Sequence, residues 1–150
     1  MGVEIERKFL VQNDDWKAQT ASSYHIIQGY MVGEPSLAVR LRIIDDTVAL
    51  LTIKGKGEGI ARPEYEYPIP VEDAKGMLAL CGNRVLEKTR HLITAKNDLK
   101  WEVDVFAGRH AGLVLAEIEL PSLDTPFDRP DWIGEDVSEN PSYLNAVLAS

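Results

Sequence analysis

The feature that most constrains this chain is the alternation of charged and apolar residues in short segments along its length. In Val39-Arg40-Leu41-Arg42-Ile43, two arginines share one face of a strand, opposite three aliphatic residues. Successive side chains of a strand point to opposite faces, so a period of two predicts β-structure rather than helix. Turn-forming residues such as Gly33-Glu34-Pro35-Ser36 and Asp45-Asp46 separate the segments. This arrangement is typical of an antiparallel barrel or sandwich.

The pattern predicts a mainly β chain with few helices. We expect strands near residues 2–11, 25–32, 37–44, 47–54, 61–69, 85–95, 99–106 and 113–121. Apolar residues at helical spacing predict a helix over 72–81, and Asn140 before Pro141 predicts a helix through about Ala149. A weaker helical pattern runs from Asp14 to Ala21, and residues 125–139 are expected to form an irregular surface arm.

Most of the predicted strands place at least two charged residues on one face. The basic residues are Lys8, Arg40, Arg42, Lys54, Lys56, Arg62, Lys88 and Arg90, and the acidic ones are Glu4, Glu6, Glu64, Glu66, Glu102, Asp104, Glu117 and Glu119. In an open sheet these charges would simply face water. In a closed barrel they would line an interior just wide enough for side chains or one small ligand, with helices packed outside. Periodicity alone leaves both interpretations open.

Charges enclosed in a barrel need partners, because a buried charge without one is very costly. Carboxylates dominate the first, seventh and eighth predicted strands, whereas cations dominate the third, fourth and sixth. Clustered carboxylate oxygens favour Mg²⁺, Mn²⁺ or Ca²⁺ over zinc. Arginine and lysine suit phosphate, the former through forked hydrogen bonds and the latter as a point charge. A closed barrel of this kind would therefore hold a polyphosphate anion together with a metal.

Composition is that of one globular domain, which we expect to span residues 1–150. Hydrophobic residues make up 45% of the chain and charged residues 27%, with no linker or repeat. The net charge of -8 disfavours non-specific binding to nucleic acid or membrane. The single cysteine, Cys81, cannot form an internal disulfide, so we expect a cytoplasmic protein. The expected partner is a small phosphate-rich molecule, and a homodimer is left open.

The opening segment Glu4-Ile5-Glu6-Arg7-Lys8-Phe9-Leu10-Val11 resembles the E-x-E-x-K signature of the CYTH superfamily, the triphosphate tunnel metalloenzymes. The resemblance continues in order through Gln28-Gly29-Tyr30, Val39-Arg40-Leu41-Arg42, Thr52-Ile53-Lys54, Glu64-Tyr65-Glu66, Glu87-Lys88-Thr89-Arg90, Glu102-Val103-Asp104-Val105-Phe106 and Ala116-Glu117-Ile118-Glu119. It covers nearly the whole chain. It implies a closed eight-stranded antiparallel β-barrel with a few helices packed outside, whose tunnel binds a triphosphate with divalent metal.

The resemblance also implies roles for individual residues. Those expected to bind phosphate are Lys8, Arg40, Arg42, Lys54, Lys56, Lys88 and Arg90, while Glu4, Glu6, Asp104, Glu117 and Glu119 are expected to hold one or two Mg²⁺ or Mn²⁺ ions. Glu64 and Glu66 would orient the cations. The catalytic residues would be Glu4, Glu117 and Lys88. Pro63 departs from a regular strand because it lacks a ladder donor, which leaves the direction of Arg62 open.

The compact length and the opening segment look most like the small bacterial members of the superfamily, which hydrolyse inorganic tripolyphosphate to pyrophosphate and phosphate. Two alternatives use the same grip on a triphosphate: a class IV adenylate cyclase and a thiamine triphosphatase. A non-catalytic polyphosphate-binding module is a third. The chain shows no distinct adenine-binding signature, and release of phosphate would separate a hydrolase from a binding module.

Overall fold

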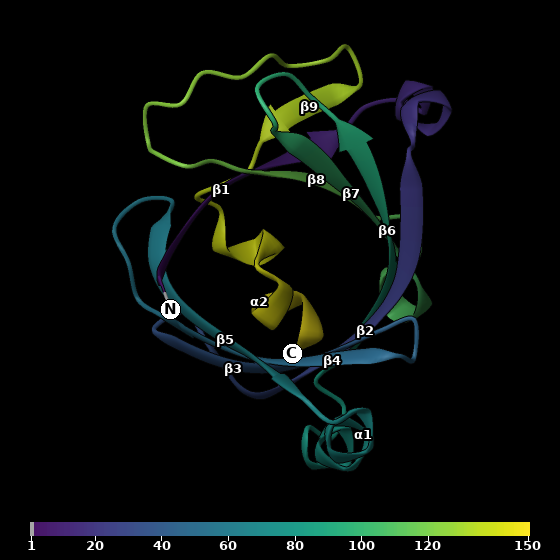
Figure 1. Ribbon diagram of the computed structural model, residues 1–150, viewed down its shortest axis with the longest axis vertical. Coiled ribbons are helices and arrows are strands. Elements are labelled where there is room, and N and C mark those ends of the chain that lie inside the picture. Colours follow the sequence, from purple (N-terminus) through teal and green to yellow (C-terminus); the bar gives the residue numbers. More distant parts are fainter. Residues whose placement is uncertain (1) are drawn as a thin grey trace.

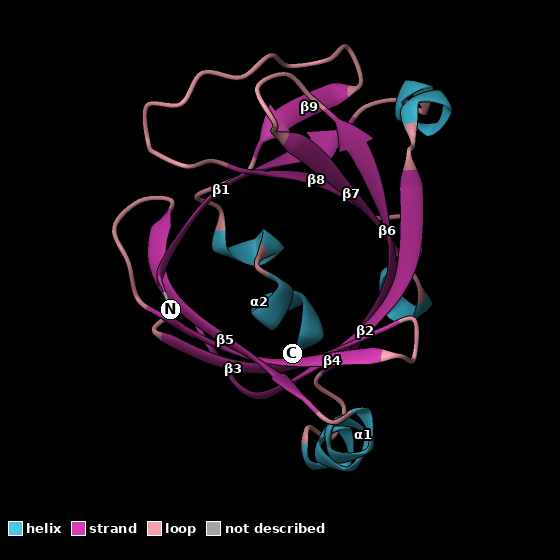
Figure 2. Cartoon of the chain, viewed as in Figure 1, coloured by secondary structure: helices cyan, strands magenta, loops and turns pink. Residues whose placement is uncertain are grey.

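Antiparallel strands dominate the computed structural model, which describes residues 2–150 (Figure 2). The strands are β1 (Gly2–Val11), β2 (Ser22–Glu34), β3 (Leu37–Ile44), β4 (Val48–Gly55), β5 (Ala61–Ile69), β6 (Val85–Thr94), β7 (Lys100–Phe106), β8 (Val114–Glu119) and β9 (Ile133–Asp136). The α-helices are α1 (Val71–Leu80) and α2 (Asn145–Ala149), and short 3-10 helices occupy η1 (Asp15–Gln19), η2 (Gly108–His110) and η3 (Pro141–Tyr143).

Within residues 2–150, eight strands close into an antiparallel barrel and one further strand lies beside it (Figure 1). The order is β5-β4-β3-β2-β6-β7-β8-β1, and a pairing of β1 with β5 completes the ring. β1 has β8 along one edge; on its other edge, β5 pairs with Gly2 to Ile5, and β9 pairs with Phe9 and Val11. The predicted closed barrel is therefore confirmed, and an open sheet is excluded.

Two hairpins show why the strands end where they do. Asp45 and Asp46, between β3 and β4, have φ angles of 49° and 60°. Asn97 and Asp98, between β6 and β7, have φ angles of 61° and 62°. Asparagine and aspartate tolerate this left-handed region, and it matches the twist that tight hairpins require. The turn residues recognised in the sequence thus set the register of the strands beside them.

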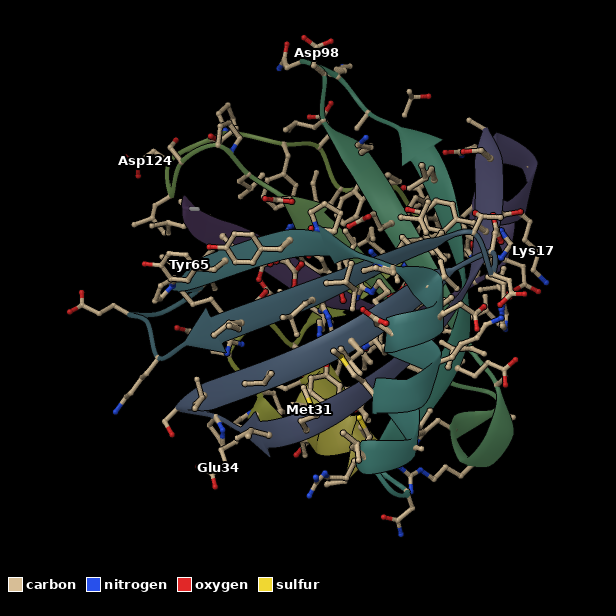
Figure 3. The ribbon with its side chains drawn as sticks, turned by 60° about the horizontal axis from the view of Figure 1, so that its bottom comes forward. Lys17, Met31, Glu34, Tyr65, Asp98 and Asp124 are labelled. Carbon is tan, nitrogen blue, oxygen red and sulfur yellow. The ribbon has the colours of Figure 1, made fainter. Side chains whose placement is uncertain are left out.

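Apolar outer faces of the barrel are covered in two places. α1 lies across the outside of β2, β3 and β4 (Figure 3), where its Ala74 packs with Ile43 and Ala49. On another part of the wall, the long arm between β8 and β9 covers a core that contains Phe9 and Trp101. The predicted irregular arm, residues 125–139, is more regular than expected, because residues 133–136 form β9.

The C-terminal helix differs from its prediction in both length and place. Residues 140–149 form the 3-10 helix η3 followed by the five-residue α2, not one continuous helix. α1 packs outside the barrel as expected, whereas α2 lies within the ring of strands (Figure 1). Its Ala149 packs against inward-facing Tyr30, Leu86 and Phe106. The barrel wall is apolar at this end, and burial of that apolar surface explains why α2 enters the barrel.

No helix within residues 2–150 combines the length and the hydropathy needed to cross a membrane.

Candidate active site

Strand register brings the predicted charged face to the inside of the barrel. Residues directly opposite each other on neighbouring strands point to the same face of a sheet. The opposed pairs include Glu4 with Arg62, Lys8 with Glu117, Glu6 with Glu119, Gln28 with Arg42, Arg40 with Thr52, Lys54 with Glu64 and Arg90 with Asp104. The open question about Arg62 is thus answered, since it shares the inner face with Glu4.

A buried ion-pair network links β6, β7 and β8. Arg90 donates from Nε and Nη2 to the two carboxylate oxygens of Asp104, at 2.8 and 2.9 Å. Its Nη1 lies 3.0 Å from Glu102, and Lys88 Nζ lies 2.7 Å from Asp104. Burial opposes ionisation of Asp104, but the charges of Arg90 and Lys88 outweigh it and hold the pKa of this carboxyl below its usual value. Asp104 is therefore the anion that holds two cations side by side.

Lys88 is the most enclosed cation of the site. Its side chain is fully buried, and its ammonium group also lies over the ring of Phe106 and donates to Asn145 Oδ1 at 3.0 Å. Burial lowers the pKa of Lys88 to about 7, with Arg90 adding to this effect and Asp104 opposing it. A second anion bound beside this buried ammonium group would favour its charged form.

Arginines occupy the neighbouring wall made by β2, β3 and β4. Arg40 donates to Thr52 Oγ1 at 3.1 Å and lies 3.4 Å from Glu66. Arg42 donates to the side-chain oxygen of Gln28 at 3.0 Å. Burial, followed by the charges of Arg40 and Arg90, lowers the pKa of Arg42 to about 10. This wall therefore carries an excess of positive charge that a bound anion would relieve.

Carboxylates gather where β1 runs beside β8. Burial, together with the charges of Glu117 and Glu4, raises the pKa of Glu6 well above its usual value. The pKa of Glu117 is well below its usual value because Lys8, Arg90 and Lys88 outweigh the effect of burial. Lys8 Nζ lies 3.4 Å from Glu117. Crowded carboxylates of this kind repel one another unless a cation lies between them.

The donor chemistry of these carboxylates fits a hard divalent cation. In the described residues 2–150, Glu117 Oε1 is buried without a hydrogen-bond partner. Carboxylate oxygens are the ligands that Mg²⁺, Mn²⁺ and Ca²⁺ prefer. In the same part of the chain, however, no three His, Cys, Asp or Glu side chains already form a group that could hold a metal. Two of the carboxylates pair with lysines, with Lys54 Nζ 2.8 Å from Glu4 Oε1 and Lys8 Nζ 3.4 Å from Glu117 Oε1.

Lys54 joins two of the predicted carboxylates. Besides Glu4, its ammonium group lies 3.5 Å from Glu64. Burial and the charge of Glu4 raise the pKa of Glu64 to about 7. Glu66, on the same strand, accepts a hydrogen bond from Thr52 Oγ1 at 2.7 Å. Both carboxylates therefore contact residues of the cationic wall.

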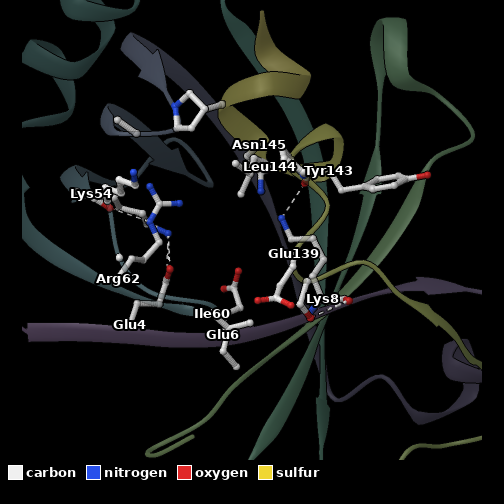
Figure 4. A pocket seen from close by; sticks show the side chains of 18 of the residues that line it. Glu4, Glu6, Lys8, Lys54, Ile60, Arg62, Glu139, Tyr143, Leu144 and Asn145 are labelled. Atoms are coloured by element: carbon white, nitrogen blue, oxygen red, sulfur yellow. Dashed lines mark hydrogen bonds and ion pairs between the residues drawn. The ribbon is translucent and has the colours of Figure 1, made fainter.

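A cavity of about 340 Å³ opens beside these residues (Figure 4). Its lining on the barrel wall includes Glu4, Glu6, Lys8, Arg40 and Lys54. Further lining comes from Arg62, from the loop at 56–60 and from residues within 30–38 and 137–146. Lys56 also lines the cavity, but it is exposed in that loop and stands apart from the inner cluster. Glu119 is exposed although its strand position faces Glu6.

Three contributors to the site had no role predicted from the sequence, although Glu102 was predicted to lie on the charged face. Thr52 is buried between Arg40 and Glu66, and Glu102 pairs with Arg90. Both share the parity of the predicted residues, so alternation was a usable signal for them. Asn145, which binds Lys88, follows no pattern of this kind. It reaches the site through the unexpected position of α2.

Comparison with known proteins identifies relatives along almost the whole chain. The CYTH domain matches residues 2–146. The inorganic triphosphatase of Acetivibrio thermocellus is 45% identical over 149 residues, covering 99% of this chain and 94% of that protein. The inorganic triphosphatase of Nitrosomonas europaea is 36% identical over 149 residues, covering 97% of this chain and 96% of that protein. The crystal structure of the inorganic triphosphatase NE1496 has a TM-score of 0.68 and 34% identity, covering 99% of this chain and 95% of that one.

A closed barrel whose interior pairs cations with carboxylates defines a tunnel protein for highly charged anions. The chain belongs to the CYTH family, whose triphosphate tunnel metalloenzymes depend on a metal.

Proposed function

We propose that this protein hydrolyses inorganic tripolyphosphate to pyrophosphate and phosphate inside its barrel, with Mg²⁺ or Mn²⁺ as cofactor. The observation that carries the proposal is the set of buried cations on the inner wall, namely Lys8, Arg40, Lys88 and Arg90. Buried cations in such number favour a ligand with several negative charges. Alignment with inorganic triphosphatases along nearly the whole chain supports tripolyphosphate as that ligand.

In this proposal the inward-facing cations of several strands bind the phosphate chain. Arg40, Arg42 and Arg90 form forked hydrogen bonds to its oxygens, and Lys8, Lys54 and Lys88 act as point charges. Lys56, exposed at the cavity mouth, meets the anion as it enters. The lowered pKa of Arg42 supports this assignment, because a bound anion would offset its repulsion by Arg40 and Arg90.

The carboxylates on the opposite wall are proposed to hold one or two divalent ions, with Glu4, Glu6, Glu117 and Glu119 as ligands. Asp104, which the resemblance also implied, is not proposed as a ligand, because both of its oxygens already bind Arg90. When bound, such an ion neutralises phosphate charge and lowers the pKa of the water that attacks the terminal phosphorus. Glu4 and Glu117 orient this water on the side of the carboxylates. Glu64 and Glu66 keep Lys54 and Arg40 directed into the barrel through the contacts described above.

Lys88 and Arg90 are proposed to stabilise the transition state. Charge on the phosphate oxygens must be held as the bond to the leaving pyrophosphate breaks, and fixed cations in a dry site do this without reorganisation. Asp104 keeps both cations in place, at 2.7 Å from Lys88 and 2.8 Å from Arg90. We also infer that the whole chain forms one catalytic domain, since β1 closes the barrel against strands from both halves of the sequence.

Phosphate release from a panel of substrates tests this function. Tripolyphosphate, pyrophosphate, ATP, thiamine triphosphate and long polyphosphate would each be incubated with Mg²⁺, Mn²⁺ or EDTA. We expect rapid release from tripolyphosphate, dependent on metal, and much slower release from the others. Absence of release from every substrate by the folded protein would contradict the hydrolase. Formation of cyclic AMP from ATP, or binding of polyphosphate without turnover, would then identify one of the alternatives.

A further inference from the structure

The C-terminal plug, defined here as residues 141–149, contacts two of the cations assigned to phosphate. Lys8 Nζ donates to the main-chain oxygen of Tyr143 at 2.9 Å (Figure 4), and Lys88 Nζ donates to Asn145 Oδ1 at 3.0 Å. Both acceptors are neutral oxygens on one short piece of chain. They occupy hydrogen bonds that a phosphate oxygen would otherwise accept.

Because Lys88 is buried, its contact with Asn145 bears on how a phosphate could reach it. Its side chain is fully buried, so a phosphate reaches its ammonium group only if a neighbour moves. Asp104 and Phe106 belong to β7, which is held between β6 and β8 by continuous pairing. Asn145, by contrast, lies at the start of the five-residue α2, which does not pair with any of the strands that the structure describes. Of these neighbours, Asn145 is therefore the one that is least firmly held.

The plug is also attached in a way that permits release. Its sequence, Pro-Ser-Tyr-Leu-Asn-Ala-Val-Leu-Ala, has no charged side chain. Apolar packing of residues such as Ala149 against Leu86 holds it, and Arg109 and His110 of η2 bond to its last main-chain oxygens. A short segment with few backbone pairings to the rest of the fold belongs to its least stable part.

We propose that the plug is an internal ligand of Lys8 and Lys88 that the polyphosphate displaces when it binds. The inference rests on the proposed function, because it takes a phosphate chain as the competing ligand. Phosphate oxygens carry negative charge and form stronger hydrogen bonds to ammonium groups than neutral oxygens do. An anion long enough to reach both lysines replaces both plug contacts, whereas a shorter one replaces one of them. The plug therefore selects for longer chains and favours release of the shorter products.

A reversible cross-link between the plug and β2 tests the displacement. A β-carbon added at Gly33 would lie 3.7 Å from the β-carbon of Ala146, which is within the usual range for a disulfide. The double variant Gly33→Cys/Ala146→Cys should therefore lock the plug when oxidised. We expect the locked form to lose at least about tenfold in kcat/KM for tripolyphosphate, and a reductant to restore it. The two single variants, treated with the same oxidant, are the controls and should keep their activity.

The cross-link in the oxidised variant would be verified by mass spectrometry. The proposal would be overturned if this oxidised variant had the same kcat/KM as the reduced one. Hydrogen exchange on the unmodified protein gives a second readout, with tripolyphosphate and Mg²⁺ as the probe, supplied in excess and followed over short exchange pulses so that hydrolysis does not deplete it. The amides of Val147, Leu148 and Ser150 bond within the plug, and displacement should make them exchange faster. Unchanged or slower exchange in the ligand-saturated protein would also overturn it. Because this readout needs binding and no turnover, it separates failure of the plug from failure of the hydrolase.

Discussion

Arg90 shows how a single residue of this protein both neutralises buried carboxylates and links neighbouring strands of the fold. It bonds both oxygens of Asp104 and one of Glu102, and lies 3.7 Å from Glu117. These partners come from β7 and β8, so one guanidinium group neutralises carboxylates of two strands. Removing one partner of a buried ion pair lowers the stability of a protein far more than replacing both partners by apolar residues, because the remaining charge stays buried without its partner.

We accordingly expect Arg90→Ala to destabilise the protein by about 3–5 kcal/mol, since Asp104 stays buried with Lys88 as its remaining close cation. Urea denaturation gives the free energy of unfolding. Lys56→Ala is the matched control: it removes a cation from the exposed loop and should change stability by less than about 0.5 kcal/mol. Equal effects of the two substitutions would show that the Arg90 network contributes little to the fold.

Glu4 allows a test of catalysis with little change in shape. Glu4→Gln removes one negative charge but keeps the size of the side chain, and should lower kcat for tripolyphosphate by at least about a hundredfold. Circular dichroism should show an intact barrel. Glu58→Gln, in the exposed loop before β5, should leave kcat unchanged. Wild-type turnover by the Glu4 variant would remove this carboxylate from the mechanism.

Asp136 links stability to pH outside the site. Partial burial opposes its ionisation, but hydrogen bonds from Ser138 and Arg7 outweigh this and lower the pKa of Asp136. A carboxyl whose pKa is depressed by folding stabilises the fold above its unfolded pKa of about 3.9, and this stabilisation disappears as pH falls through the folded value. We expect Asp136→Asn to be less stable than the wild type at neutral pH and equally stable in acid. A constant difference across thermal unfolding curves at each pH would contradict this.

For the strands and helices, local sequence patterns predicted the positions of strands well, but they did not predict structure that depends on contacts between distant parts of the chain. Each of the eight predicted strands matches one of β1–β8, because alternation and turn residues act over a few neighbouring positions. β9 was not predicted, since residues 133–136 become a strand by pairing with β1, more than a hundred positions away. The place of α2 was missed for the same reason. Its apolar stripe indicates that it packs, but not on which face of the barrel.

The contact between α1 and β2 depends on one glycine. A β-carbon at Gly29 would lie 2.8 Å from Cys81 Sγ and 2.9 Å from Leu78 Cδ2. Gly29→Ala should thus push the end of α1 away and cost about 1–3 kcal/mol. Gly76→Ala, inside α1 with nothing within 4 Å of the new atom, should instead stabilise the protein by about 0.5–1 kcal/mol. The two urea midpoints should therefore move in opposite directions, and a common direction would refute this account.

On the scale of the whole molecule, the sequence predicted most of the charged residues that line the interior, but not which of them contact one another. Alternation predicted that eight cations and eight carboxylates share one face, and closure of the barrel made that face the inside. Lys56, which lies in an exposed loop, and Glu119, which is exposed on its strand, are exceptions. Which residues meet across the interior depends on register and barrel shape. The contact of Lys54 on β4 with Glu4 on β1 spans an intervening strand, β5, and no spacing in the sequence reveals it.

A ligand that contacts charged residues on several strands of the barrel should raise the free energy of unfolding of the whole protein. A ligand that binds the folded protein alone raises its stability by about 2.7 kcal/mol at a hundred times its dissociation constant. We expect tripolyphosphate with Mg²⁺ to raise the melting temperature by several degrees, and EDTA to abolish most of this rise. The temperature can be followed by tryptophan fluorescence, and orthophosphate at equal ionic strength is the control. A rise that EDTA leaves intact would show that the metal contributes little to binding.

The three pairings of β1 also bear on how the chain is made. β1 leaves the ribosome before β5, β8 and β9, all of which it must contact, so its pairing with β8 waits until about residue 119 has been synthesised. Contacts between such distant positions form slowly, because a long loop must close before any pairing offsets its entropy. During that interval the alternating charges on β1 have no partners, and they keep an unpaired strand edge in water rather than on another chain.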